Sequence, residues 1–296
     1  MSLPRLIFVT GKGGTGKSTV AAALALALAR HHPTTLADLD RRKSALRLLA
    51  SRDGHNDGKP YSLADGLEGI ALSPHHELQA FIERMVPVKA ISRRMLQSRT
   101  FGYVTAALPG LEAFLMLDRL RIMAGEAALK DRYLVVDGPA SGSALELLSV
   151  ASGVKGIAPS GTLNRLADNV HSFLIDATRF GVAITVSAEE MALREALETA
   201  ATLRDRLGIQ WIVAILNATS KALFDTAEIA ALSPLKAHAQ LARRRNAIAE
   251  YTVHAREQLK AAGLAVVELP TLFLPELGRS AANQLADKID KALAHR

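Results

Sequence analysis

A glycine-rich segment near the N-terminus constrains the fold of this chain more than any other feature. Residues 10–19 read T-G-K-G-G-T-G-K-S-T, which matches the phosphate-binding pattern G-x-x-x-x-G-K-[ST]. Glycines let a loop turn its backbone N–H groups toward phosphate oxygens, and a helix that follows directs its positive end at the same ligand. An apolar run, Arg5–Val9, precedes the loop, and an alanine- and leucine-rich run, Val20–Ala29, follows it. This order of elements predicts a nucleotide-binding α/β fold.

Each residue type in the loop has a task in phosphate binding. Lys17 is expected to reach the β and γ phosphates, and the Ser18 hydroxyl is expected to bind Mg²⁺. The predicted nucleotide-binding residues of the loop are Gly11, Gly13, Gly14, Thr15, Gly16, Lys17, Ser18 and Thr19. Because the chain lacks a guanine-reading N-K-x-D segment, the predicted nucleotide is ATP or ADP rather than GTP.

Short strand-like runs alternate with longer helical stretches along the chain. Strands are expected at Arg5–Thr10, Thr35–Leu39, Gly69–Ser73, Tyr133–Asp137, Val182–Ser187, Trp211–Asn217 and Ala265–Leu269. Strands separated by helices indicate βαβ units and predict a doubly wound, mostly parallel sheet flanked by helices. We predict a single P-loop domain over residues 1–296, with helical inserts at about 74–130 and 143–181.

The clearest helical pattern lies between Glu189 and Leu207. Its apolar residues recur at the spacing of one helix face, at Leu193, Ala196, Leu197, Ala200, Leu203 and Leu207. Ser187 followed by Glu190 matches a capping box, which predicts that the Ser187 side chain caps this helix.

Composition excludes several kinds of site. The chain has no cysteine, which excludes disulfides, thiolate zinc sites and cysteine catalysis. The 36 Lys and Arg residues exceed the 29 Asp and Glu residues, and the net charge of +7 suits nucleic acid, an acidic partner, anionic lipid or simply a solvated surface. Aromatic residues make up only 4%, which argues against base-stacking platforms. The first strand begins without a charged-then-apolar leader, so a cytoplasmic location is expected.

Two predicted strands end in carboxylates that suit a metal–nucleotide site. Tyr133–Asp137 ends in Asp137, at the position where a P-loop fold holds Mg²⁺ through water. The residues at 138–143, G-P-A-S-G-S, are small and turn-prone, as a switch that senses the γ-phosphate requires. Asp40 follows another strand, and it is expected either to orient the attacking water or to cap the next helix. The predicted Mg²⁺ ligands are Ser18, Asp40 and Asp137.

Lys12 together with residues 13–18, G-G-T-G-K-S, forms the deviant Walker A motif, so the chain resembles the dimerising SIMIBI-class P-loop NTPases. Within that class it resembles the branch that contains the arsenite-pump ATPase ArsA and the eukaryotic ATPase that targets tail-anchored membrane proteins. Further matched segments are residues 36–40 as switch I, 137–148 as switch II, V-S-A-E-E-M-A-L-R-E-A from Val186, and W-I-V-A-I-L-N ending at Asn217. Leu269–Pro270 followed by P-E-L-G at 275–278 is similar to the adenine-side loop of the family.

The resemblance implies a role for each matched residue. Lys12 is expected to cross a dimer interface and neutralise charge on the phosphates bound by the partner subunit, as an arginine finger does. Lys12, Lys17 and Asp40 form the expected catalytic set. Asn217 and Pro270 are expected to frame the adenine.

The chain also departs from the family. The family motif D-T-A-P-T-G-H at switch II is replaced by D-G-P-A-S-G-S at 137–143, and a basic triplet follows Asp40 at 41–43. Arsenite is held by thiolates and the eukaryotic dimer is joined by zinc on paired C-x-x-C motifs, so a chain without cysteine forms neither site. A dimer with itself or with a paralogue is expected to close by packing and shared nucleotide.

Three functional hypotheses follow. The first is a dimeric ATPase that couples its nucleotide state to the binding of a client, such as a hydrophobic protein segment. The second is a nucleotide-binding scaffold with little turnover that pairs with a paralogue. The third is a positioning ATPase like ParA or MinD. No nucleic-acid partner is clearly indicated, and membrane contact is expected to be peripheral at most.

Several segments allow both a binding role and a structural role. Apolar residues at 81–86, 95–96 and 114–117 suit a client-binding groove, but their spacing equally suits buried core, which we favour. Arginines at 93–94 and 243–245 suit lipid headgroups or an acidic subunit, and solvated helix faces are the favoured interpretation. The stretch 286–293 is weakly amphipathic and too polar for a membrane anchor.

Overall fold

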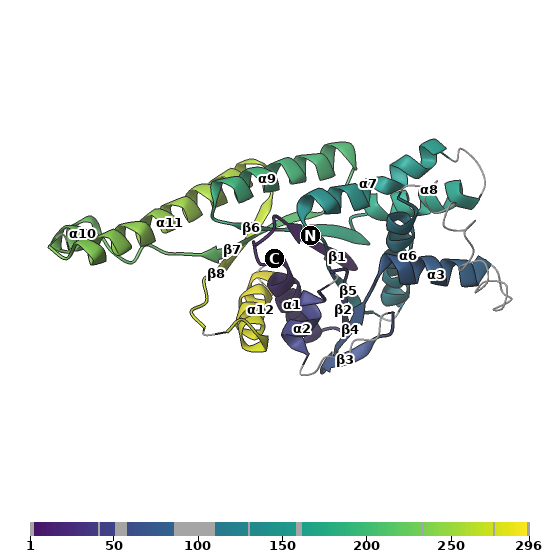
Figure 1. The fold of residues 1–296 in the computed structure, drawn as a ribbon, viewed down its shortest axis with the longest axis horizontal. Coiled ribbons are helices and arrows are strands. Elements are labelled where there is room, and N and C mark those ends of the chain that lie inside the picture. Colours follow the sequence, from purple (N-terminus) through teal and green to yellow (C-terminus); the bar gives the residue numbers. More distant parts are fainter. Residues whose placement is uncertain are drawn as a thin grey trace.

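The computed structural model describes residues 3–40, 42–50, 58–85, 110–129, 131–157, 162–232, 234–274 and 276–294. Strands and helices alternate along these residues (Figure 1). The strands are β1 (Leu6–Gly11), β2 (Thr34–Asp38), β3 (Tyr61–Ala64), β4 (Leu67–Ala71), β5 (Tyr133–Asp137), β6 (Phe180–Ser187), β7 (Ile212–Thr219) and β8 (Ala265–Pro270). The helices are α1 (Lys17–Ala29), α2 (Ser44–Leu49), α3 (Pro74–Met85), α6 (Leu111–Leu129), α7 (Ser141–Ile157), α8 (Thr162–Ile175), α9 (Glu190–Ala201), the π-helical turn η1 (Thr202–Arg206), α10 (Thr226–Ala231), α11 (Lys236–Ala261) and α12 (Arg279–Ala294).

The strands form one sheet in the order β3-β4-β2-β5-β1-β6-β7-β8. Every neighbouring pair is parallel except β3 and β4, which run antiparallel. Because β1 lies inside the sheet and the chain adds strands on both sides of it, the predicted doubly wound, mostly parallel sheet is confirmed. The described helices α3 and α6 lie in the first predicted insert, and α7 and α8 occupy most of the second.

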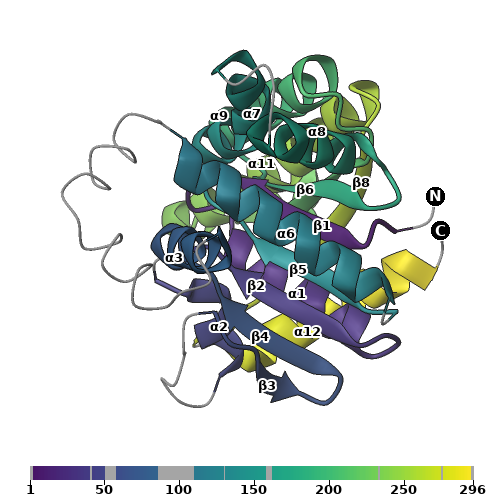
Figure 2. The ribbon, with the colours of Figure 1, turned by 90° about the vertical axis from the view of Figure 1, so that its right-hand side faces the viewer.

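Apolar side chains pack on both faces of the sheet. Leu6 and Phe8 of β1 join a cluster with α6, α7, α8 and α9, whereas Ile7 and Val9 face α1, α2 and α12. Figure 2 shows these two layers of helices on either side of the strands. Successive residues of a strand point to opposite faces, so a strand covered on both sides is apolar throughout.

The apolar segment 114–117 is buried in the first of these clusters, which confirms that it belongs to the core. The predictions for 81–86, 93–94 and 95–96 fall on residues whose side chains lie outside the described part of the chain.

One strand differs from the prediction. All seven predicted strands are present with small shifts at their ends, but β3 was not predicted. It pairs with β4 as an edge hairpin around Asp65-Gly66, where Gly66 has a φ of 68°. Tyr61–Ala64 is a short edge strand that is only partly buried, so its sequence lacks the apolar run that marks the central strands.

The start of α9 also differs from the prediction. The predicted capping box at Ser187 is wrong, because Glu189 is the residue that precedes the helix and it makes no side-chain capping bond. The Ser187 carbonyl accepts a hydrogen bond from the Glu189 N–H at 2.8 Å, so Ser187 forms a turn before the helix begins. The predicted apolar face is correct, and the pattern continues into η1, where Leu203 is buried.

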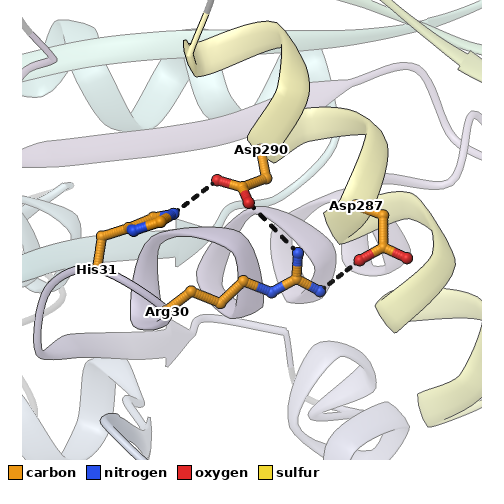
Figure 3. Close-up of polar contacts among 4 residues, drawn as sticks. All are labelled: Arg30, His31, Asp287 and Asp290. Carbon is orange, nitrogen blue, oxygen red and sulfur yellow. Dashed lines mark hydrogen bonds and ion pairs between the residues drawn. The ribbon is translucent and has the colours of Figure 1, made fainter.

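Helix α12 packs along α1, the helix that follows the phosphate loop. Its apolar residues share a buried cluster with α1, and they are Ala282, Leu285, Ala286 and Ile289. Ion pairs close the end of this contact (Figure 3): Arg30 reaches Asp287 at 2.6 Å and Asp290 at 3.5 Å, and the His31 ring reaches Asp290 at 2.8 Å. The apolar face of the stretch 286–293 is therefore covered by α1. Among the described residues, no helix is long and apolar enough to cross a membrane.

Candidate nucleotide-binding site

The phosphate loop connects β1 to α1 and has the backbone that its glycines allow. Gly14 and Gly16 each have a φ of 89°, and Gly16 directly precedes the first turn of α1. Such positive values favour glycine, because a Cβ would be strained there. The first backbone N–H groups of α1 have no partner within the helix, so they and the positive helix end are directed at the loop. The loop therefore has the geometry of an anion site.

Three donors of the loop converge on one backbone carbonyl. The Lys12 carbonyl oxygen accepts from the Lys17 ammonium at 3.3 Å and from the Thr15 hydroxyl at 2.9 Å. The Thr15 N–H also donates to it, at 3.3 Å. The Lys17 side chain thus lies over the loop rather than extending away from it, and Lys12 itself is partly exposed.

Two buried carboxylates lie side by side next to this loop. Asp38 ends β2 and Asp137 ends β5, and the two are direct partners in the parallel pairing of these strands. Both are fully buried. Asp38 accepts backbone N–H bonds from Asp40 at 2.9 Å and from the first turn of α2 at 3.0 and 3.2 Å. Neither carboxylate oxygen of Asp137 has a hydrogen-bond partner of normal geometry among the described residues.

Burial makes this pair electrostatically costly. The pKa of Asp137 is raised to about 7, first by burial and then by the charge of Asp38, while the Ser18 hydroxyl and the Lys17 charge act in the opposite direction. Burial also raises the pKa of Asp38 to about 6, although three backbone N–H bonds favour its charged form. The unpaired carboxylate oxygens of buried Asp137, next to buried Asp38 and a serine hydroxyl, form an oxygen-rich, anionic environment that suits a hydrated divalent cation. The residues present therefore fit Mg²⁺.

Asp40 lies at the entrance of the same region and is partly buried. Its carboxylate accepts from the Ser44 hydroxyl at 2.7 Å and from the Arg42 N–H at 3.2 Å. The alternative role predicted for Asp40, capping the next helix, is instead filled by Asp38, whose carboxylate binds the N–H groups of Ala45 and Leu46. Arg41 lies outside the described residues.

Asn217 contacts the phosphate loop directly. Its side-chain N–H donates to the Thr15 carbonyl at 2.9 Å, and a Cβ on Gly16 would lie 2.4 Å from the same nitrogen. Pro270 ends β8 and pairs with Thr219 at the end of β7. Both residues thus lie at the carboxyl ends of adjacent strands, where ligands bind in open parallel sheets. Their contact with adenine stays a prediction, and Pro275 of the predicted loop is outside the described residues.

The segment that follows Asp137 is tied to two other elements. The Pro139 carbonyl accepts from the Thr10 hydroxyl at 2.8 Å, and the Gly138 N–H donates to the Val9 carbonyl at 2.9 Å. Ser141, the first residue of α7, donates its hydroxyl to a carboxylate oxygen of Glu195 on α9. The hydrogen bond between Ser141 and Glu195 therefore couples the position of this segment to α9.

Sequence reasoning missed three residues of this region. Asp38 was visible in the run L-A-D-L-D, because alternate residues of a strand share a face, but no role was assigned to it. Thr185 lies opposite Gly11 in the sheet, buried and with an unpaired hydroxyl among the described residues. Glu195 is 54 residues from Ser141, and no local pattern reports such a contact.

Comparison with known proteins agrees with this architecture. Residues 4–159 match the family described as Anion-transporting ATPase, whose profile carries the name ArsA ATPase. The ATPase BagA of Mycobacterium tuberculosis is 26% identical over 210 residues, which cover 66% of this chain and 59% of that protein. Proteins named as arsenical pump-driving ATPases are 28% identical over 231 residues in Halobacterium salinarum and 30% identical over 154 residues in Chlorobaculum tepidum. These alignments cover 72% and 49% of this chain, and 35% of each relative.

This chain thus spans less than two thirds of the length of these relatives. The match covers the phosphate loop, both aspartate-bearing strands and the switch segment that follows Asp137. The match includes more than half of the chain, and it contains Lys17, Asp40 and Asp137 of the candidate site. The chain therefore belongs to the ArsA family of anion-transporting ATPases.

Proposed function

We propose that this chain hydrolyses ATP with Mg²⁺ as part of a dimer, with itself or with a paralogue, and that the nucleotide state controls the binding of a client protein. The observation that carries the proposal is the buried pair Asp38 and Asp137 beside Ser18 and Lys17. The buried carboxylate of Asp137 lacks hydrogen-bond partners among the described residues and lies beside the carboxylate of Asp38, and a bound cation would offset the cost of burying this charge. The family membership of the chain supports the same assignment.

The residues of the site divide the work of the reaction. The loop N–H groups and the N-terminal end of α1 bind the phosphates. The Lys17 ammonium leaves the Lys12 carbonyl and donates to a phosphate oxygen instead. Ser18 and Asp137 would hold Mg²⁺, which would neutralise phosphate charge when bound. Asp40 orients a water whose oxygen bonds to the γ-phosphorus while the bond to the bridging β–γ oxygen breaks.

Lys12 is proposed to act on the second subunit. It lies at the loop surface and is only partly buried, so it is accessible to a partner. A cation that arrives from the partner stabilises the charge that develops on the leaving phosphates, and it makes turnover depend on dimer formation.

The coupling to a client is proposed to run through the switch segment. Loss of the γ-phosphate frees residues 138–143, and the Ser141–Glu195 contact passes the movement to α9. Helix α9 packs against both α7 and α11, so the movement reaches the helix layer on that face.

The test compares ATP hydrolysis and mass in solution for the wild type, Lys12→Ala and Asp40→Asn, with exposed Lys260→Ala as the matched control. We expect ATP-dependent dimerisation and turnover in the wild type and the control. Lys12→Ala should lose both, and Asp40→Asn should dimerise with turnover reduced by at least about 100-fold. If all four proteins, including the wild type, bind ATP tightly and none of them hydrolyses it, the enzymatic assignment is overturned. That result would favour a scaffold that needs a catalytic paralogue. Hydrolysis stimulated by DNA would favour a ParA-like role.

A further inference from the structure

Helix α11 extends beyond the body of the protein and forms a projecting arm with α10 (Figure 1). We define the arm as residues 221–249, of which 233 is not described. The C-terminal half of α11 is anchored on the body, where Leu259 is fully buried. In the arm, Asn246 donates to the Phe224 carbonyl at 2.5 Å and fixes the incoming segment against the helix. The apolar residues that α11 buries within the arm are alanines, at positions 239, 242 and 249.

Within the arm, the larger apolar side chains of α11 are exposed. Positions 237, 241, 244, 245 and 248 have the spacing of one helix face, which we call the outer stripe. In it, Leu241 is 65% exposed and Ile248 is 39% exposed. Within the arm, the helix thus presents leucine and isoleucine to solvent while it buries alanine, the reverse of an ordinary surface helix. Such an arrangement indicates a partner for the outer stripe.

The charge of the arm indicates the chemistry of that partner. Between 235 and 249 the chain carries Lys236, Arg243, Arg244 and Arg245, and no acidic residue. Within the described part of the chain, none of these four cations is in an ion pair. The acidic residues at 225 and 228 are used in the capping box of α10. Arg245 lies over the ring of Phe273, 5.3 Å from its centroid, and this ring is 79% exposed.

We propose that the arm binds an anionic lipid surface, a role beyond the proposed ATPase. Leu241 and Ile248 enter the headgroup boundary, and the exposed Arg244 beside them contacts lipid phosphates, whereas Arg245 is partly buried over Phe273. Long arginine side chains suit this arrangement, because their stems cover apolar surface while their charges stay in water. Phosphate binding on a nucleic acid would give no role to the exposed leucine and isoleucine. A bilayer accepts a projecting helix without a matching groove.

The test is sedimentation of the full chain with vesicles of phosphatidylcholine alone and with vesicles that also contain phosphatidylglycerol. We expect binding only to the anionic vesicles, weakened by salt. One cation near such a surface changes affinity about fivefold, so Arg243→Glu/Arg244→Glu, at two exposed positions of the arm, should weaken binding well over tenfold. Leu241→Ser/Ile248→Ser should weaken it without removing its salt dependence. Lys288→Glu/Lys291→Glu makes the same charge change at exposed positions of α12. This control should weaken binding only as much as the lower net charge of the whole protein does, and therefore less than the arm variant.

Three results would overturn the proposal. The first is the absence of any binding to anionic vesicles, and the second is an equal loss of binding in the α12 variant, which would assign the effect to overall charge or to α12. The third is self-association or RNA binding that depends on the outer stripe while vesicle binding is absent, which would identify a second copy or a nucleic acid as the partner. Thermal melting of each variant establishes that it folds.

Discussion

The buried charge of Asp137 should lower the free energy of unfolding of the nucleotide-free protein, and Asp137→Asn should raise it. A pKa of about 7 in place of the ordinary 3.8 means that ionisation costs the folded protein about 4 kcal/mol, because each pH unit is worth about 1.4 kcal/mol. The pKa is higher in the folded protein than in the unfolded chain, so the cost is fully present above pH 7 and disappears as the pH falls toward 4. Asparagine is nearly the same size and carries no charge, and its amide can donate to the neighbouring Asp38.

The assay is thermal unfolding of the nucleotide-free protein at pH 8 and pH 5. For a chain of this length, about 4 kcal/mol corresponds to a rise in Tm of about 6 °C at pH 8, and the gain should fall below half of this at pH 5. Exposed Asp205→Asn is the control and should stay within about 0.5 kcal/mol of the wild type at both pH values. With Mg²⁺ and ATP added, the wild type should gain stability and the Asp137 variant should gain little. An asparagine variant that is no more stable than the wild type at pH 8, or equally stabilised at both pH values, would refute the reasoning.

Three further changes test the supporting structure. Gly11→Ala places a Cβ 2.1 Å from the Thr185 carbonyl oxygen at a φ of 144°, so we expect the free energy of unfolding to fall by at least about 2 kcal/mol in denaturant titrations. Glu195→Ala removes the acceptor of the buried Ser141 hydroxyl and should cost about 1–2 kcal/mol, whereas Glu195→Gln should recover most of the loss; equal values for both would show that the hydrogen bond is unimportant. Asp290→Asn breaks exposed ion pairs with the end of α1 and should cost less than about 1 kcal/mol, with a smaller difference at high salt.

The central strands and the phosphate loop were predictable because their signals are local. A strand covered on both faces is a short apolar run, and the loop needs glycine at fixed positions, so both are visible within about ten residues of sequence. The edge strand β3 is partly exposed and lacks that run. The capping box at Ser187 failed because a spacing of three residues fits a cap but does not fix the backbone that a cap requires.

The candidate site was predicted in part for the same reason. Asp40 and Asp137 are found from their place after apolar runs, but the burial of Asp38 beside Asp137 depends on which strands become neighbours. The same holds for the contact between Ser141 and Glu195, which joins two distant helices. The arm was not predicted, and only its arginines at 243–245 were noted, because exposure of Leu241 depends on how far α11 extends past the sheet.

The packing of α12 on α1 means that α1 is synthesised long before the helix that covers it. Arg30 and Asp287 are 257 residues apart, so at about 5–20 residues per second the ribosome needs roughly 13 to 50 s to supply the helix that covers α1. During that time the alanine- and leucine-rich side of α1 is open to chaperones or to other nascent chains. A chain that stops before α12 would carry every residue of the phosphate loop and yet leave this side exposed. Helix α12 therefore gives the cell a physical means to distinguish copies that include it from copies that stop before it.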